Sequence, residues 1–478
     1  MESIALFTLV VPFIGALLAV LVPKQCKWTA QLFSLLATLG TLALAYSFFS
    51  AGAQSTHFNL LSVGQIELFG FTVDKVSTLI AVAVVSLGFL VSFYSLGYMS
   101  PANREHAQTG DPRYYAFLLV FIGAMAGMVL SSTVLGQLLF FEITGACSWS
   151  LIGYYQKESS FKAGLKALIV THIASLGLFV AAAFLFKATG TFSIEALAQL
   201  DDTTKTIVLC GVLMAAWGKS AQLPMHVWLP DAMNAPTPVS AYLHAASMVK
   251  VGVYIFARAL MSAGNVPEIV GMVGVAGAII TMIYGFIMYL PQKDMKRLLA
   301  YSTIAQLAYM FLALSIGALG SRLALDSGVT YLFNHAFAKS LFFLVAGSLS
   351  YTAGTRMLPQ LQGIVKGSPL LAVGFCVAAL AITGVPPFNI FFSKFSLMQA
   401  GFAMSDQYPW LTPVLVIALI ESVASFGWIM YWFGKTVLGE PSEPVATAQP
   451  LPASMKFVLV VLIIMSLFSS AIAAGWLA

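Results

Sequence analysis

The stretch from Ala215 to Lys250 reads AAWGKSAQLPMHVWLPDAMNAPTPVSAYLHAASMVK, and it decides the fold of this chain. It is apolar enough to lie in a bilayer, yet it contains two lysines, two histidines and four prolines. A lysine at the bilayer centre costs about 2.5–3.5 kcal/mol on the insertion scale, so each one needs a partner or a function. Pro224 removes a helical hydrogen bond, and irregular backbone at that depth is tolerated only against protein or water. We therefore expect a broken membrane helix with Lys219 beside buried water, the alternative being a lysine that snorkels from a helix end.

The composition indicates an all-α polytopic membrane protein rather than a soluble enzyme. Hydrophobic residues make up 59% of the chain and charged residues only 9%. The first apolar run, residues 4–22, has no basic residue before it, so we interpret it as a retained helix and not a cleaved signal. The four cysteines are single and far apart, which argues against a zinc or iron–sulfur cluster built from this chain alone. The net charge of +5 comes mostly from loop residues and does not indicate nucleic-acid binding.

Windows of about 20 apolar residues predict about 14 transmembrane helices in a single membrane domain, residues 1–478. Alternation around Gly64 and Gln65 predicts a small hairpin over residues 58–73. The expected helices are 4–23, 28–49, 77–99, 113–132, 135–155, 161–187, 206–233 (broken), 238–261, 266–290, 295–319, 322–352, 369–403 (broken), 410–433 and 455–477.

The basic residues predict the orientation of the chain. Most of the 23 lysines and arginines, Lys296 among them, fall in the odd-numbered connections between the expected helices. Positive charge marks the cytoplasmic side, so we expect both termini to face outward, on the opposite side of the membrane. Four lysines instead fall inside expected helices: Lys219, Lys250, Lys339 and Lys394.

Two of the 18 acidic residues, Glu142 and Glu421, fall well inside an expected helix, and Asp231 lies near the end of another. An isolated carboxylate at that depth would protonate or find a cation, and the four buried lysines are the candidates. We expect Glu142 to approach Lys219, which favours the charged lysine, and to withdraw, which releases its proton. The simpler alternative is a structural ion pair between two helices.

The segment AITGVPPFNIFFSK, residues 381–394, repeats the pattern of the opening stretch. It breaks at residues 384–387 and carries Lys394 just after the break. Two interrupted helices in corresponding places indicate an inverted-repeat transporter with its site near the midplane. We expect two inverted five-helix repeats, helices 4–8 over residues 113–261 and helices 9–13 over residues 266–433, with helices 7 and 12 broken.

Titratable groups that hydrogen-bond through water can move protons along such a bundle. We expect a transverse row of them for proton translocation. His335 and Lys339 are four residues apart and share a helix face, which predicts a local proton-passing pair. The predicted row consists of Glu142, Lys219, Lys250, His335, Lys339 and Lys394.

Four more residues are candidates for proton access or exit. His226 follows Pro224 and would line cytoplasmic access, while His244 lies about 120° around one helix from Lys250. His172 is a proton-access candidate, with a satisfied polar core group as the favoured reading. Glu421 is an exit group or a hydrogen-bond anchor. His57 and His106 fall in loops and are expected to be inert.

Several segments resemble a known family. Four segments are similar to the antiporter-like proton-channel subunits. They are FFEITG (residues 140–145), the opening stretch, DMKRLLAYSTI (residues 294–304) and NHAFAKSLFF (residues 334–343). That family occurs in complex I, multisubunit cation/proton antiporters and membrane-bound [NiFe] hydrogenases. Three further segments resemble component D of hydrogenase-4, a membrane subunit in assemblies of the formate hydrogenlyase type, more closely. They are RYYAFLLVFIGAMAG (residues 113–127), ALAITGVPPFN (residues 379–389) and IESVASF (residues 420–426).

The resemblance implies roles for the row. Glu142 and Lys219 match the family's switching ion pair, Lys250 its central relay and Lys394 its exit-side lysine, with His335 and Lys339 between them. Two departures stand out: residues 171–175 read THIAS where the largest complex I member has an Arg and an Asp, and the long lateral helix of that member is missing.

The resemblance also implies partners and a function. The [NiFe] centre and iron–sulfur clusters would lie in peripheral hydrogenase subunits, beside other antiporter-like membrane subunits and a formate dehydrogenase, with no cofactor in this chain. The expected function is proton translocation driven by electron transfer in those partners. The alternatives are a subunit of a sodium/proton antiporter or of an NADH:quinone oxidoreductase, and a scaffold whose buried charges only hold helices together.

Overall fold

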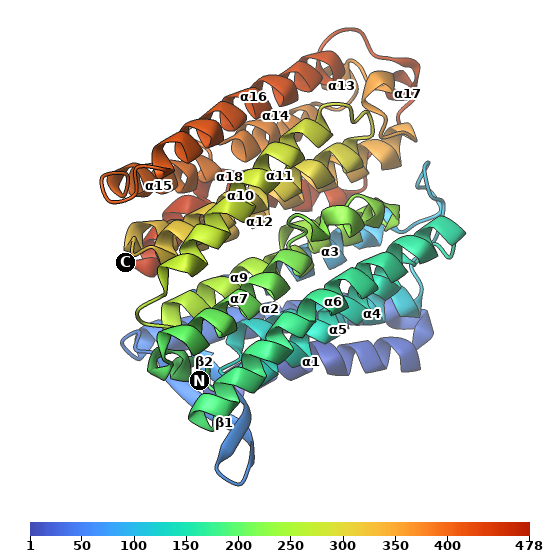
Figure 1. Ribbon diagram of the computed structural model, residues 1–478. Helices are drawn as coiled ribbons and strands as arrows, with labels where there is room; N and C mark the ends of the chain where they lie inside the picture. Colours follow the sequence, from blue (N-terminus) through green and yellow to red (C-terminus); the bar gives the residue numbers. More distant parts are fainter.

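Long apolar runs joined by short polar turns fold into a bundle of helices lying side by side in the computed structural model, which describes residues 1–478 (Figure 1). Twelve helices are long and apolar enough to cross a membrane, which makes the chain a multi-pass integral membrane protein. The uninterrupted helices are α1 Glu2–Leu21, α2 Cys26–Ser50, α3 Lys75–Tyr98, α4 Pro112–Leu130, α5 Val134–Ile152, α6 Glu158–Thr189, α10 Glu268–Tyr289, α11 Met295–Ala318, α12 Arg322–Ala353, α16 Leu411–Val437 and α18 Ala453–Leu477.

The opening stretch of the sequence is interrupted twice. Helix α7 (Asp202–Lys219) stops at Lys219, and two single turns, η3 (Met225–Trp228) and η4 (Asp231–Asn234), lead to α8 (Thr237–Ala245) and α9 (Met248–Ser262). The break after Lys219 confirms the prediction from Pro224. The continuous helix predicted over 238–261 is wrong, because the backbone leaves helical geometry between α8 and α9. No proline or glycine marks that second interruption, so the sequence carries no local signal for it.

The second interrupted segment consists of α14 (Pro369–Thr383) and α15 (Asn389–Ala403). Helix α14 ends on Gly384, whose φ of 80° is left-handed and therefore suits a residue without a side chain. Two prolines follow, and they prevent the helix from resuming before Asn389. With these two segments the bundle follows the expected order of helices. The count of 14 spans and the division into inverted repeats at 113–261 and 266–433 stay predictions.

The predicted extramembrane hairpin is confirmed. Strands β1 (Thr56–Val63) and β2 (Ile66–Val73) pair antiparallel. Gly64 has φ 61° in the turn between them. The hairpin lies at the same end of the bundle as the C-terminus, since Lys75, just after β2, donates a hydrogen bond to the carbonyl of Leu477. Figure 1 shows both termini towards this end. The side of the membrane on which it lies stays a prediction.

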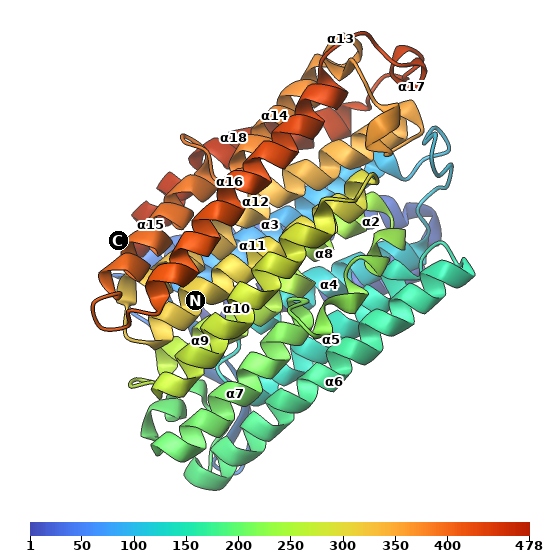
Figure 2. The same ribbon diagram turned by 45° about the horizontal axis from the view of Figure 1, so that its top comes forward.

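Helices α11 and α12 occupy the centre of the bundle, between α4–α7 on one side and α14, α16 and α18 on the other (Figure 2). Their apolar windows are wholly buried, whereas only 28% of the window in α16 and 33% of that in α18 are buried. The polar side chains on α11 and α12 are therefore shielded from lipid by the other helices.

Candidate functional site

Six lysine side chains are buried in the bundle without an ion-pair partner, and four of them belong to the predicted row. These four residues are 0% (Lys219), 1% (Lys250), 0% (Lys339) and 6% (Lys394) exposed. They lie on α7, α9, α12 and α15, and each of these helices packs against the next. Buried ammonium groups are normally paired with carboxylates, so four that contact only neutral groups require an explanation other than stability.

Lys219 is the last residue of α7, where the helix breaks. Its Nζ donates to Thr144 Oγ1 at 3.1 Å and lies 4.4 Å from the centroid of the Phe141 ring. Gly145 makes room for the ammonium group, because a Cβ at that position would stand 3.3 Å from Nζ. The amine is therefore held by a hydroxyl and an aromatic face, both of them neutral.

Glu142 does not pair with Lys219 in this structure. Its Oε2 lies 3.1 Å from Nδ1 of His172, and Oε1 has no partner in the protein. The His172 side chain is 60% exposed on the outer face of α6, so the favoured reading of His172 as a polar core group is wrong. The ion pair that the resemblance implies for Glu142 and Lys219 is therefore not formed in this structure, and the Glu142 side chain is 31% exposed. Its switching role stays a prediction.

Lys250 and His335 are in direct contact at the centre of the bundle. Lys250 Nζ lies 2.7 Å from His335 Nδ1, and its other contact is the Met310 sulfur at 3.5 Å. This distance is that of a hydrogen bond, and either group can be the donor, depending on which of them carries the proton. The predicted His335–Lys339 pair is not formed, because Lys339 donates to Ser302 at 3.0 Å instead.

The interruption between α8 and α9 changes the position predicted for His244. His244 lies on α8 and Lys250 on α9, so the two residues do not share one continuous helix and the predicted offset of about 120° between them is wrong. His244 is fully buried, with Nδ1 3.3 Å from Thr303 Oγ1 and Nε2 without a protein partner. His226, in η3, contacts the Tyr284 hydroxyl at 2.8 Å and is half-buried.

Lys394 lies at the other side of the bundle, in α15. Its Nζ donates to Ser422 Oγ at 2.9 Å and to the Thr383 carbonyl at 3.3 Å, at the end of α14. Glu421 lies beside it on α16 and is 4% exposed, but the two residues form no ion pair. The carboxylate accepts instead from the Tyr309 hydroxyl at 2.6 Å and from the Ser425 hydroxyl.

The break in α7 connects the first lysine to the second. Gly252 allows α9 to approach this break closely, since a Cβ there would meet the Ala216 carbonyl at 2.2 Å. Ser220, next to Lys219, donates to the carbonyl of Val249, next to Lys250, at 2.8 Å. The interrupted backbone thus brings the two lysines onto adjoining segments.

Comparisons with known proteins agree with this architecture. Residues 131–421 match the family described as NADH:quinone oxidoreductase/Mrp antiporter, TM, and residues 61–118 match the one described as NADH-ubiquinone oxidoreductase (complex I), chain 5 N-terminus. The chain is 34% identical to NADH-quinone oxidoreductase subunit L of Campylobacter jejuni over 91% of its own length and 71% of that protein. The chain belongs to this antiporter-like family.

Other proteins similar to the antiporter-like chain include one that is much longer and two solved structures of about the same length. It is 31% identical to a probable K(+)/H(+) antiporter component of Rhizobium meliloti, covering 98% of this chain and 47% of that protein. A chain of the Mrp complex from Dietzia sp. DQ12-45-1b has the same fold, with a TM-score of 0.86, 20% identity, and coverage of 100% of this chain and 96% of that one. An archaeal membrane-bound sulfane sulfur reductase contains another chain of this fold, with a TM-score of 0.84 and 23% identity. The match covers 99% of this chain and 95% of that one.

Sequence analysis missed the hydroxyl groups that contact the row in this antiporter-like chain. Each lysine of the row other than Lys250 donates to a serine or threonine hydroxyl within 3.1 Å, and Glu421 accepts from the phenol of Tyr309. Hydroxyls on apolar helices are common, so the sequence alone does not distinguish these. The adjacent Ser302 and Thr303, inside an expected membrane helix, were the clearest available signal.

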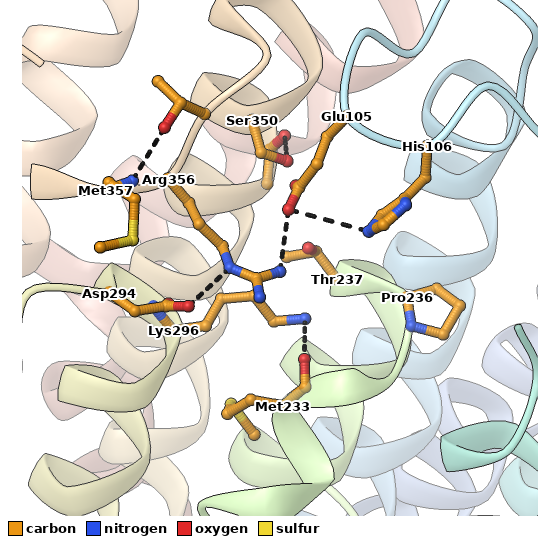
Figure 3. A network of polar contacts seen from close by, with 12 residues as sticks. Glu105, His106, Met233, Pro236, Thr237, Asp294, Lys296, Ser350, Arg356 and Met357 are labelled. Carbon is orange, nitrogen blue, oxygen red and sulfur yellow. Dashed lines mark hydrogen bonds and ion pairs between the residues drawn. The ribbon is translucent and has the colours of Figure 1, made fainter. Parts of the chain in front are cut away.

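A second polar network lies outside the row (Figure 3). It lies at the end of the bundle opposite the hairpin, because α3 runs from Lys75, next to the hairpin, to Tyr98, next to the network. Arg356 joins Asp294 and Glu105, each at 2.9 Å. His106 lies 3.7 Å from Glu105, and burial lowers the pKa of its imidazole, against the opposing charge of Glu105. The network connects the α3–α4, α10–α11 and α12–α13 connections, helix α13 being Ile364–Gly367. His106, expected to be inert, is therefore part of a structural cluster.

Lys296 lies beside this network and corrects a further expectation. The sequence placed it in a solvated connection, but it is only 1% exposed. Its ammonium donates to the carbonyls of Met233 at 3.0 Å and Ala235 at 2.7 Å, which lie between α7 and α8 (Figure 3). Lys296, at the start of α11, therefore joins the second half of the chain to the interrupted segment that follows Lys219.

Proposed function

We propose that this chain is the proton-translocating membrane subunit of a membrane-bound [NiFe] hydrogenase of the hydrogenase-4 or formate hydrogenlyase type. The observation that carries the proposal is the series of buried lysines on consecutively packed helices, none of which has a carboxylate partner. Such groups cost stability, and groups of this kind in membranes mark ion pathways. Partner subunits would hold the [NiFe] and iron–sulfur centres.

The geometry supports a switch at Glu142. In this structure its carboxylate contacts His172, and Lys219 contacts Thr144. When Glu142 turns inward it would stabilise the protonated lysine, and when it returns to His172 the ammonium is left with neutral groups and loses its proton. Moving one proton against roughly 180 mV requires about 4 kcal/mol at 2.3 kcal/mol per 100 mV, which opening a buried ion pair can supply.

The released proton would then pass along the row. Lys250 Nζ and His335 Nδ1 lie 2.7 Å apart, close enough to exchange a proton, and Lys339 follows on α12. Lys394 would deliver it to the exit side beside Glu421. His226 and His244 would serve access from the cytoplasm. Several buried polar atoms here have no protein partner, Nε2 of His335 and of His244 among them, and these are the places where bridging water is expected.

The hydrogenase assignment depends on the segments 113–127, 379–389 and 420–426, whose resemblance is closest to that class. No group of three or more His, Cys, Asp or Glu is placed to hold a metal ion. The redox centres would come from partners, including peripheral iron–sulfur subunits and a formate dehydrogenase. The chain would lie in a bacterial inner membrane with both termini periplasmic. Its similarity to NADH-quinone oxidoreductase subunit L and to a K(+)/H(+) antiporter component favours the corresponding complexes as alternatives.

The row can be tested by proton transport in inverted membrane vesicles that contain the assembled complex and oxidise hydrogen. Lys219→Met should abolish hydrogen-dependent acidification per assembled complex, and Glu142→Gln should reduce it strongly. Lys205→Met is the matched control, because Lys205 is also buried on α7 but donates to the carbonyls of Ala263 and Asn265, away from the row. If Lys219→Met lowers assembly alone, with transport per complex unchanged, the lysines are a scaffold.

The class of complex can be tested by isolating the chain with its partners. Mass spectrometry of the subunits that co-purify with an affinity-tagged chain should find iron–sulfur proteins together with a [NiFe] catalytic subunit. Small antiporter subunits, or the subunits of an NADH dehydrogenase, would refute the hydrogenase assignment and leave proton translocation standing. Acidification that is equal with and without sodium would favour protons as the transported ion, since a sodium site requires several oxygen ligands.

A further inference from the structure

The contacts between Lys394 and Glu421 involve a tyrosine that the proposed pathway does not use. Tyr309, on α11, is fully buried. Its hydroxyl donates to Glu421 Oε2 at 2.6 Å and lies 2.5 Å from the carbonyl of Ala418. The face of the same ring receives Lys394, whose Nζ lies 4.4 Å from the ring centroid. One side chain therefore contacts both the ammonium group and the carboxylate.

We propose that Tyr309 is a positioning residue that keeps the Glu421 carboxylate from closing onto the Lys394 ammonium group, an inference that rests on the proposed function. Both groups contact the same Tyr309 side chain, the carboxylate at its hydroxyl and the ammonium group 4.4 Å from the centroid of its ring, so a change of side-chain rotamer would bring them together. The Tyr309 hydroxyl satisfies the carboxylate, and its ring attracts the ammonium by a cation–π contact. Each charge is thus stabilised separately.

The separation matters because an ion pair holds a proton on lysine. A carboxylate in contact with a buried ammonium group favours the protonated form, and the proton then leaves only at higher pH. A lysine that contacts a π face, a hydroxyl and a carbonyl is charged but free to release its proton. Lys394 is the last lysine of the row, so its release step would set the pH at which the pathway delivers protons.

The other titratable groups around Glu421 do not replace Tyr309. Tyr289, on α10, donates to Ser425, which in turn donates to Glu421 Oε1. Tyr331, on α12, donates to Gln306, and its ring lies 6.3 Å from that of Tyr309. Neither phenol contacts the oxygen that Tyr309 holds. Removal of the Tyr309 hydroxyl would therefore leave Oε2 of Glu421 free to turn towards Lys394.

Tyr309→Phe tests the inference, since it keeps the ring below Lys394 and removes only the hydroxyl. Proton transport by vesicles containing the assembled complex should be measured across the pH range of the compartment that receives the protons. A hydrogen bond to a charged group changes an equilibrium by roughly 10-fold to 100-fold, so the pH of half-maximal transport should rise by about 1 to 2 units. Ser425→Ala removes the other hydroxyl donor of Glu421 and should shift the profile in the same direction by less.

Tyr254→Phe is the matched control. Tyr254 is also buried, and its hydroxyl donates to the carbonyl of Val129 at 2.5 Å, without contact to a carboxylate. Its profile should match that of the unchanged complex. A Tyr309→Phe profile that keeps its midpoint, whether or not the rate falls, would overturn the inference, because loss of packing lowers the rate without moving the midpoint. If Tyr309→Phe prevents assembly, the Ser425→Ala profile decides, and an unchanged midpoint overturns the inference.

The same vesicles separate this inference from the proposed function. If the Lys219→Met complex transports no protons and the Tyr309→Phe complex keeps the pH profile of the unchanged complex, only the role proposed for Tyr309 is wrong. Transport that continues in Lys219→Met means that the pathway itself is wrong, whatever the Tyr309 variant does.

Discussion

Removal of the Arg356 guanidinium should loosen the three connections that it holds together (Figure 3). Its Nε contacts Asp294 Oδ2 and its Nη1 contacts Glu105 Oε1, both at 2.9 Å. The side chains of the arginine, Asp294 and Glu105 are 24%, 17% and 16% exposed. In Arg356→Ala both carboxylates would keep most of their burial and lose their cation.

The expected cost follows from that partial burial. Exposed ion pairs contribute about 0–1 kcal/mol, whereas removing one partner of a fully buried pair costs about 3–5 kcal/mol. Side chains that are a sixth to a quarter exposed fall between these limits, so each contact should contribute about 1.5 kcal/mol and the pair about 3 kcal/mol. Arg356→Lys keeps the charge but cannot contact both carboxylates in the same planar geometry, and should lose about half of this.

Unfolding in mixed micelles at increasing dodecyl sulfate, followed by circular dichroism, would measure these free energies. Double-mutant cycles with Glu105→Gln and Asp294→Asn isolate each contact. Asparagine keeps the cap of α11 that Asp294 provides through the backbone N–H of Lys296 at 2.8 Å, so the cycle reports the arginine contact alone. Coupling energies below about 0.5 kcal/mol in both cycles, the level of exposed pairs, would refute the reasoning.

Three further predictions concern single positions. Gly384→Ala places a Cβ 2.9 Å from Cδ of Lys394 at a φ of 80°, so transport by the assembled complex should fall several-fold, and an unchanged rate would contradict the assigned role of Lys394. Gly177→Ala places a Cβ 2.2 Å from a backbone carbonyl of α7, which should destabilise the α6–α7 contact by about 1–3 kcal/mol in the micelle assay. Gly475→Ala, with open space around it, is its control and should have no such effect. Because the native His106 has a lowered pKa, the unfolded chain binds its proton first and stability falls as pH drops below about 6.5. His106→Gln should show a smaller loss of thermal midpoint between pH 7.5 and pH 5.5, and an identical loss would mean that His106 does not titrate differently on unfolding.

The fold was largely predictable because hydropathy and helix breakers act locally. Apolar runs of membrane length located the long helices within a few residues, and Pro224 and Gly384 marked two of the three interruptions. The third, between α8 and α9, carries no such residue. The backbone N–H groups of Ala246 and Ser247 both donate to the carbonyl of Tyr242 there, and this segment is fully buried among the other helices. Tertiary context, which single-sequence patterns do not contain, decides that position.

The site was predictable in its charges but not in its contacts. Lysines inside apolar helices are visible in the sequence, and Lys219, Lys250, Lys339 and Lys394 are all buried. Which neighbour each one selects depends on helix rotation: His335 contacts Lys250 on another helix and not Lys339 four residues away on its own. A rotation of one residue about a helix axis is about 100°, so spacing alone leaves such pairings open.

The two kinds of partner, neutral groups and carboxylates, are distributed unevenly along the row. Neutral groups, which are hydroxyls, an imidazole and aromatic faces, contact the lysines, so no lysine is fixed in its protonated form by an ion pair. The two intramembrane carboxylates lie towards the two sides of the bundle, Glu142 near Lys219 and Glu421 near Lys394. Glu142 is 31% exposed and can change its partner, whereas Glu421 is buried and held by two hydroxyls. If the row conducts protons as proposed, the carboxylate that can change its partner lies beside Lys219 and the carboxylate that is held in place lies beside Lys394.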